Sequence, residues 1–172
     1  MAIIKILQYP DPRLKKKGRK VGVFNDEIKR AIDDMFETHY STANCAALAA
    51  TQLDFANPWH ITVIDFSPRK DQPLCLVNTE IVTREGEMLE EEGCMSVPGG
   101  TYEKVKRAAK IHVRAQDRFG KPLEFDAEGF MAKCIQHELD HLNGILFIDR
   151  LSSLKRQRID TRLAKWRKEQ EQ

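Results

Sequence analysis

The chain has 172 residues, with 28 lysines and arginines against 26 aspartates and glutamates, and its formal net charge is +2. This length suits a single domain with a proper core, which we expect over residues 1–172, and it excludes two domains of ordinary size. The 4 cysteines are unevenly spaced and do not resemble a disulfide framework, so we expect a reducing, cytoplasmic environment.

The N-terminal region predicts one helix and no targeting segment. The apolar run at residues 3–7 is interrupted by Lys5 and followed by Pro10, which leaves no signal-peptide core and no membrane span. We interpret the basic cluster at residues 15–20 as a solvated face in preference to a nucleic-acid or ribosome contact. Asn25 can cap a helix that runs to about His39, so that His39 is a helix-end residue and no ligand. The apolar stripe of this helix is Ile28, Ile32, Met35 and Phe36.

Short runs typical of strands follow. We expect strands at residues 60–66, 74–78, 80–83, 110–117 and near 123–126, with a turn at 118–121. Cys75 falls in the second run and is interpreted as a buried core residue. His60 and His112 fall in strands and are interpreted as structural.

A long helix is predicted from about Ala127 to Asn143, with Gly144 supplying the stop. Strands grouped before it indicate an α+β fold, in which mostly antiparallel sheets pack around this central helix. A C-terminal helix is expected within residues 151–168, capped by Ser152 or Ser153. Its sparse apolar face is Leu154, Ile159, Leu163 and Trp166. Its other faces are basic, which leaves ribosome docking and a merely solvated helix as alternatives.

The sequence His137-Glu138-Leu139-Asp140-His141 reads H-E-x-x-H within the central helix. Two histidines four positions apart share one helical face and can bind one metal ion, beside which the glutamate can act on a water molecule. Metzincin-type proteases require a third histidine where this chain has Phe147. A thermolysin-like site requires a downstream glutamate, and the only ones lie in the polar tail, at positions 169 and 171.

A cysteine is the remaining type of third ligand. Cys134 lies on the histidine stripe, but its Cα is roughly 7 Å back along the axis from the point midway between the histidines, so we interpret it as a buried small residue. Cys94 lies in a glycine-punctuated segment, residues 90–100, where a side chain can be directed at a site.

Three elements of the chain resemble peptide deformylases. Glu92-Gly93-Cys94-Met95-Ser96 is similar to their E-G-C-L-S element, the segment at 137–141 fits H-E-x-D-H, and Cys45–Gln52 corresponds to G-x-G-L-A-A-x-Q. The elements occur in the family's order, and the likeness extends from residue 9 to residue 155. The resemblance implies one divalent metal ion bound by Cys94, His137 and His141, with water as the fourth ligand. Fe²⁺ is the expected ion, and Zn²⁺, Ni²⁺ or Co²⁺ would fit the same ligands.

The resemblance also implies an activity and roles for further residues. The activity is removal of the formyl group from the N-terminal methionine of new polypeptides by a cytoplasmic monomer. Glu138 would transfer the proton, and the Gln52 amide and the Met95 backbone N–H would stabilise the oxyanion. The expected substrate-binding residues are Ala46, Ala47, Leu48, Glu92, Gly93, Phe130, Lys133 and Cys134. Arg107 and Asp140 are expected to steady the ligands.

The chain departs from the family pattern at three positions. Cys45 and Ala47 replace glycines, so side chains there are expected to narrow the groove or shift the strand that pairs with the peptide. We interpret Cys45 as a packed small residue in preference to a redox-sensitive thiol. Lys133 stands where the family has an apolar residue in the methionine pocket. The alternatives are a paralogue with altered substrate preference, another H-E-x-x-H metallopeptidase and a non-catalytic, ribosome-associated or structural metal protein.

Overall fold

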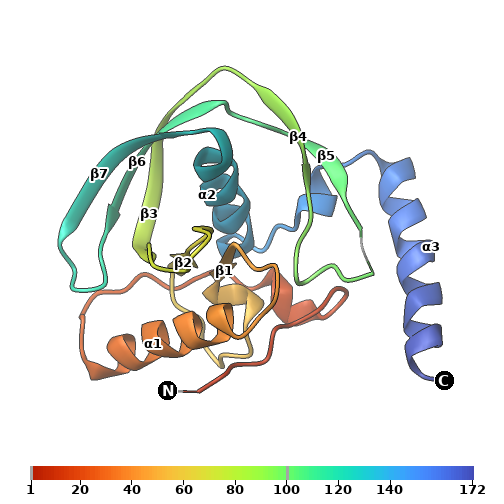
Figure 1. Ribbon diagram of the computed structural model, residues 1–172, viewed down its shortest axis with the longest axis horizontal. Coiled ribbons are helices and arrows are strands. Elements are labelled where there is room, and N and C mark those ends of the chain that lie inside the picture. The colour runs from red at the N-terminus through yellow and green to blue at the C-terminus, as the bar shows by residue number, and fades with distance from the viewer. Residues whose placement is uncertain (1, 100) are drawn as a thin grey trace.

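The computed structural model describes residues 2–99 and 101–172, and its central helix lies between two antiparallel sheets (Figure 1). Met1, and Gly100 of the glycine-punctuated segment, lie outside the described residues. The larger sheet has the order β1-β2-β3-β6-β7, and the smaller sheet pairs β4 with β5. The strands are β1 (Ala47–Ala49), β2 (Ile61–Ile64), β3 (Leu74–Glu85), β4 (Met88–Glu92), β5 (Glu103–Arg107), β6 (Lys110–Gln116) and β7 (Pro122–Glu128). The helices are α1 (Asp26–Tyr40), α2 (Gly129–Leu142) and α3 (Ser153–Gln170), with 3₁₀ turns η1 (Pro12–Lys15), η2 (Ala50–Gln52) and η3 (Phe147–Arg150). The expected α+β architecture is confirmed.

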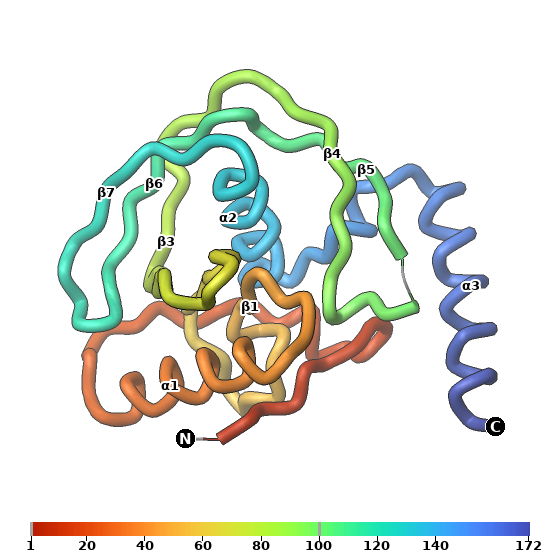
Figure 2. Tube along the Cα trace, viewed as in Figure 1, coloured from red at the N-terminus to blue at the C-terminus, as the bar shows by residue number. Residues whose placement is uncertain are grey.

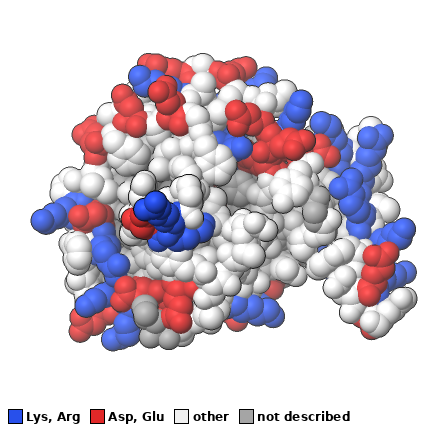
Figure 3. Space-filling model, in the orientation of Figure 1, with Lys and Arg blue, Asp and Glu red and all other residues white. Residues whose placement is uncertain are grey.

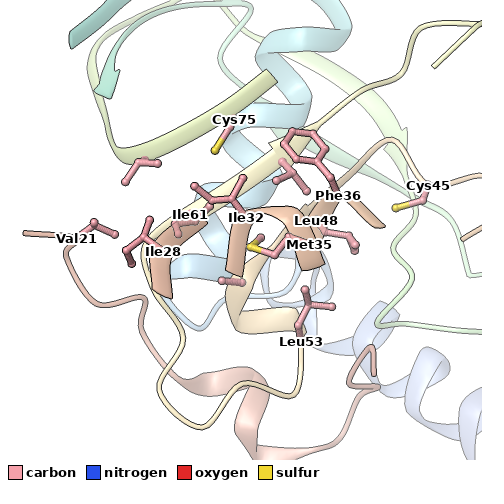
Figure 4. Packing of buried hydrophobic residues seen from close by; sticks show 13 residues of the cluster. Val21, Ile28, Ile32, Met35, Phe36, Cys45, Leu48, Leu53, Ile61 and Cys75 are labelled. Carbon is pink, nitrogen blue, oxygen red and sulfur yellow. The ribbon is translucent and has the colours of Figure 1, made fainter. Parts of the chain in front are cut away.

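The predicted first helix is present and covers the core of the larger sheet. The Asn25 side chain accepts a hydrogen bond from the backbone N–H of Ile28 at 3.2 Å, which caps α1. Ile28 and Met35 are buried and pack with β1 and β2 residues such as Leu48 and Ile61 (Figure 4). Each such side chain stabilises the fold by ~1.5–3 kcal/mol when fully buried.

β3 is one continuous strand where the sequence indicated two. Its register against β6 shifts between Val77 and Glu80, around Asn78, whose φ is 53°. The Asn78 side chain accepts from the backbone N–H of Val21 at 2.9 Å and donates to the Val21 carbonyl at 2.8 Å. The expected break at residue 79 was therefore wrong. A bulge absorbs the irregularity, and the Asn78 amide supplies hydrogen bonds to the neighbouring segment.

β4 and β5 form a hairpin that the sequence patterns did not predict. Met88 pairs with Arg107 at one end and Glu92 with Glu103 at the other. The two strands are rich in glutamate and lysine, so they lack the apolar alternation that indicates a strand. Val105 is buried, and so are the charged residues Glu92 and Arg107. The hairpin therefore carries two charged groups into the interior.

The central helix starts later than expected. β7 continues to Glu128, which pairs with Lys110, and α2 then begins at Gly129. Gly129 has φ 61°, a left-handed conformation that allows an abrupt change from strand to helix. At the other end, α2 stops at Leu142, and Gly144 has φ 75°. The helix therefore has a glycine-marked boundary at each end.

α3 stands at the edge of the fold, on the side of β4 and β5 (Figure 2). The Ser152 side chain caps it, and the helix runs to Gln170, beyond the predicted end. Ile159 and Leu163 are buried, whereas Leu154 is 57% exposed. The assignment of Leu154 to the apolar face was wrong because it lies about 140° around the helix from Ile159 at ~100° per residue. None of the helices in the described part of the chain is long and apolar enough to cross a membrane.

We predict that Gly144→Ala destabilises the protein. A Cβ at this position would lie 2.5 Å from the Lys15 carbonyl oxygen, and the residue has φ +75°. We expect a loss of ~1–3 kcal/mol in the free energy of unfolding, measured by urea denaturation. Gly22→Ala is the control, because nothing lies within 4 Å of a Cβ there. Equal stabilities of the two variants would contradict the prediction.

Candidate active site

α2 brings the histidines of the H-E-x-x-H segment together inside the protein. His137 and His141 are both buried, and their Nε2 atoms are 3.1 Å apart. The i, i+4 spacing puts the two rings on one face of the helix, so that they converge on one point. His60, just before β2, and His112, in β6, do not belong to this group.

Cys94 completes a cluster of three donor atoms. Its Sγ is 3.2 Å from His141 Nε2, and the donor atoms of Cys94, His137 and His141 all lie within 4.8 Å of one another. A tetrahedral ion with bonds of ~2.3 Å to sulfur and ~2.1 Å to nitrogen would hold such donors roughly 3.3–3.6 Å apart. The observed spacing is close to this, so the residues fit one divalent ion and leave a fourth position for a ligand from solution.

A buried ion network supports this cluster from behind. Glu92 Oε1 lies 2.8 Å from His137 Nδ1, and Arg107 donates to both Glu92 oxygens at 2.8 Å. Arg107 and Arg150 both donate to Asp140. Burial alone would raise the pKa of Glu92, but the hydrogen bonds from Arg107 and His137 lower it to about 2. Glu92 is thus a permanent carboxylate that orients the His137 ring through Nδ1 and leaves Nε2 facing Cys94.

Glu138 is a buried carboxyl group next to His137 in the sequence, and it is not part of the three-donor cluster. It is 4% exposed, and its Oε2 has no hydrogen-bond partner among the described residues. Burial raises the pKa of Glu138 to about 7. Because Glu138 also lines the cavity beside the cluster, it is a group that can both accept and release a proton there.

Gln52 is held in one orientation next to Cys94. Its Oε1 accepts from the backbone N–H of Ala49 at 2.9 Å. Its Nε2 therefore faces the other way, 3.3 Å from Cys94 Sγ and 3.1 Å from Ser96 Oγ. Met95 also lines the cavity. An amide donor is thus available beside the three-donor cluster before any ligand binds.

A cavity of about 250 Å³ opens in front of these groups. Most of the residues that the sequence indicated for substrate binding line it, namely Ala46, Ala47, Glu92, Gly93, Phe130, Lys133 and Cys134. The Leu48 side chain does not reach the cavity, because alternation along β1 turns it into the core, where it is fully buried. Glu92 lines the wall with its carboxylate occupied by Arg107 and His137.

Three further lining residues, Asn44, Glu91 and Tyr102, were absent from the predicted substrate-binding residues. Tyr102 is 61% exposed and packs on Gly93, where a Cβ would lie 2.4 Å from Tyr102 Cε1. Glycine at position 93 therefore allows the aromatic ring to close on the cysteine-bearing segment. A lone tyrosine at the end of a glycine-containing segment was the available signal for this residue.

The side chains that stand where the family has glycine, Cys45 and Ala47, do not project freely into the cavity. Cys45 is 3% exposed, its Sγ is 3.3 Å from His39 Nδ1, and burial raises the pKa of its thiol to about 12. It is a packed residue, as expected, and not a reactive thiolate. Ala47 belongs to a second buried cluster that also contains Ala132 and Cys134 of α2. Both side chains line the cavity, but they are small and almost fully buried.

Three comparisons with known proteins agree with one another. The family model for polypeptide deformylases matches residues 3–157. Peptide deformylase 1 of Coxiella burnetii is 72% identical over 167 residues, which cover 97% of this chain and 98% of the relative. A peptide deformylase of Chromobacterium violaceum is 50% identical over 169 residues, or 98% of this chain and 99% of the relative. A crystal structure of a Legionella pneumophila peptide deformylase superposes with a TM-score of 0.91 at 46% identity, covering 99% of both chains.

We predict that Arg107→Met strongly destabilises the protein. The substitution leaves Glu92 buried without its cation, and breaking such a pair costs ~3–5 kcal/mol. Urea denaturation at matched metal content measures the loss. Lys106→Met is the control on the same strand, because its ammonium is exposed and a change within ~0.5 kcal/mol is expected there. A similar loss in both variants would show that the buried pair has no special role.

Proposed function

Because this chain belongs to the polypeptide deformylase family, we propose that it removes the N-formyl group from the N-terminal methionine of newly synthesised polypeptides and releases formate. The observation that carries the proposal is the convergence of Cys94, His137 and His141 next to the unpartnered carboxyl of Glu138. The cavity in front of them is lined by most of the residues that the family resemblance indicates.

We propose that Cys94 Sγ, His137 Nε2 and His141 Nε2 hold one divalent metal ion. A thiolate and two imidazoles suit Fe²⁺, Zn²⁺, Ni²⁺ or Co²⁺, and we propose Fe²⁺ on the family resemblance. When bound, such an ion supplies Lewis acidity that favours attack on the formyl carbonyl near neutral pH. The contact of His137 Nδ1 with Glu92 supports this assignment, since histidine ligands usually donate their second N–H to a carboxylate or carbonyl.

Glu138 is proposed as the proton-transfer residue. Its carboxylate takes a proton from the water that attacks the formyl carbon and delivers that proton to the departing amine. Gln52 Nε2 and the Met95 backbone N–H are proposed to donate to the formyl oxygen as it gains negative charge. The bond from the Ala49 N–H to Gln52 Oε1 supports this role, because it keeps the amide nitrogen directed at the site.

The substrate peptide is proposed to lie along β1. This strand is at the edge of its sheet and pairs only with β2 among the described strands, so its other edge is free to add an extended peptide. Ala47 is the first residue of β1, and it lines the cavity together with Ala46 and Gly93. The first side chain of the substrate would enter the pocket formed by Phe130, Lys133 and Cys134.

We predict that Glu138→Gln abolishes turnover without loss of metal. Formate release from formyl-Met-Ala-Ser by iron-loaded protein, measured without oxygen, should fall at least ~100-fold because the proton acceptor is gone. Metal content, measured by mass spectrometry, should equal that of the parent protein, because Glu138 is no ligand. Glu85→Gln, at an exposed strand end, is the control. An unchanged rate in Glu138→Gln would favour a non-catalytic metal protein.

We also propose that α3 docks on the ribosome, where a monomer of this enzyme would meet nascent chains in the cytoplasm. Basic side chains line α3 at the right of Figure 3. Arg156 is paired with Asp149, and Lys155 lies 3.8 Å from Glu103. Among the described residues, the basic side chains of α3 that are exposed and have no acidic partner are Arg158, Arg162, Lys165 and Lys168. Their free charge supports contact with phosphate groups.

Reversing the charge of Arg158, Arg162 and Lys165 to glutamate should weaken ribosome binding more than tenfold in co-sedimentation at low salt. Binding of the parent protein should fall steeply as potassium chloride is raised, because released counterions drive the contact. The control is charge reversal at three exposed and unpaired basic residues elsewhere, Lys29, Arg30 and Lys121. Equal effects of the two triple variants would mean that α3 is a solvated helix.

A further inference from the structure

Lys133 lines the cavity, whose other charged lining residues are Glu91, Glu92 and Glu138. It lies on α2 one turn before His137, and its side chain is 14% exposed. Its Nζ is 3.3 Å from Glu90 Oε2 and 3.2 Å from the Glu91 carbonyl oxygen, both on β4. The same Nζ lies 5.0 Å from the centre of the Phe130 ring. The lysine therefore spans from α2 to β4 across the side of the cavity.

The charge of the Lys133 ammonium group is balanced, but not all of its N–H donors have an acceptor. An ammonium has three N–H donors, and among the described residues Lys133 Nζ has two acceptors, the Glu90 carboxylate and the Glu91 carbonyl. No third acceptor is found among the described residues, and the Phe130 ring face near Nζ is a weaker partner than an oxygen atom. Because Glu90 balances the charge of Lys133, this ion pair offers one hydrogen-bond donor without adding net charge to the pocket.

The remaining pocket wall decides which side chains can use this donor. Ala46, Phe130 and Cys134 give an apolar passage that suits an unbranched side chain. Glu91 and Glu138 also line the cavity without a cationic partner among the described residues, so they oppose a side chain with a negative charge. A neutral oxygen acceptor at the end of a flexible, methionine-length side chain meets both conditions.

Resting on the function proposed above, we propose that this enzyme accepts N-formyl peptides whose first side chain ends in a neutral hydrogen-bond acceptor. Methionine sulfoxide is the side chain that fits best. Lys133 is the residue that selects this side chain. The sulfoxide oxygen would take the third Nζ donor in place of the Phe130 ring. An apolar residue at position 133 would instead force the sulfoxide to lose its hydration without a partner, which is costly. Methionine itself needs only the apolar passage and the aliphatic stem of Lys133.

The test compares two substrates in four proteins. Formate release from formyl-Met-Ala-Ser and from its methionine sulfoxide form gives kcat/KM for the iron-loaded parent, Lys133→Met, Lys133→Arg and Lys106→Met. We expect the sulfoxide-to-methionine ratio to fall about tenfold or more in Lys133→Met, since a charge-assisted hydrogen bond is lost. Lys133→Arg should retain most of the ratio because it keeps a cationic donor. Lys106→Met, which removes an exposed ammonium, should leave it unchanged.

The outcomes separate this inference from the proposed function. Turnover of the methionine peptide with the same ratio in the parent and Lys133→Met overturns the role of Lys133 and leaves the deformylase activity intact. If neither peptide releases formate, the proposed function is overturned. In that case calorimetric binding of Met-Ala-Ser and its sulfoxide form decides the inference, which requires Lys133→Met to weaken the sulfoxide peptide selectively. Lys133→Leu serves as the second apolar variant if Lys133→Met does not fold.

Discussion

The site depends on the buried guanidinium of Arg107. It donates to both oxygens of Glu92 and to Asp140, and so ties the β4–β5 hairpin to α2. Burying any of these charged groups without a partner would cost roughly several kcal/mol. Because Glu92 also contacts His137 Nδ1, the interaction that joins the two elements also fixes the orientation of a ring in the three-donor cluster. The stability of the hairpin and the geometry of the three-donor cluster therefore depend on the same ion pair.

The two sides of the site are positioned by different means. His137 and His141 are fixed by the regular geometry of α2. Cys94 lies on an irregular segment, and it is placed by hydrogen bonds from the backbone N–H of Ser96 and from the Gln52 amide. A helix supplies precision without special contacts, whereas an irregular segment needs them at each residue. This difference explains why so many polar contacts of the site gather around the cysteine.

The helices could be predicted because their signals are local. Asn25 and Ser152 are N-caps in the structure as the sequence indicated, and the spacing of the histidines requires only that the segment be helical. The β4–β5 hairpin could not be predicted from apolar alternation. Its strands consist largely of charged residues, and the burial of Glu92 and Arg107 follows from their partnership, which no single-residue preference reveals. Burial of a charge is a property of a pair in space and not of a position in the chain.

The same limit applies to the substrate pocket. The sequence shows a lysine where an apolar residue would be expected, but it cannot show where the ammonium of Lys133 is directed. That direction is set by the Glu90 carboxylate and the Glu91 carbonyl, which are within reach of Lys133 because β4 lies beside α2. The hairpin that holds Glu92 against His137 thus also determines the polarity of the pocket wall. In this fold, therefore, a change in the register of β4 against β5 would alter the three-donor cluster and the polarity of the pocket wall together, because Glu90, Glu91 and Glu92 all lie on β4.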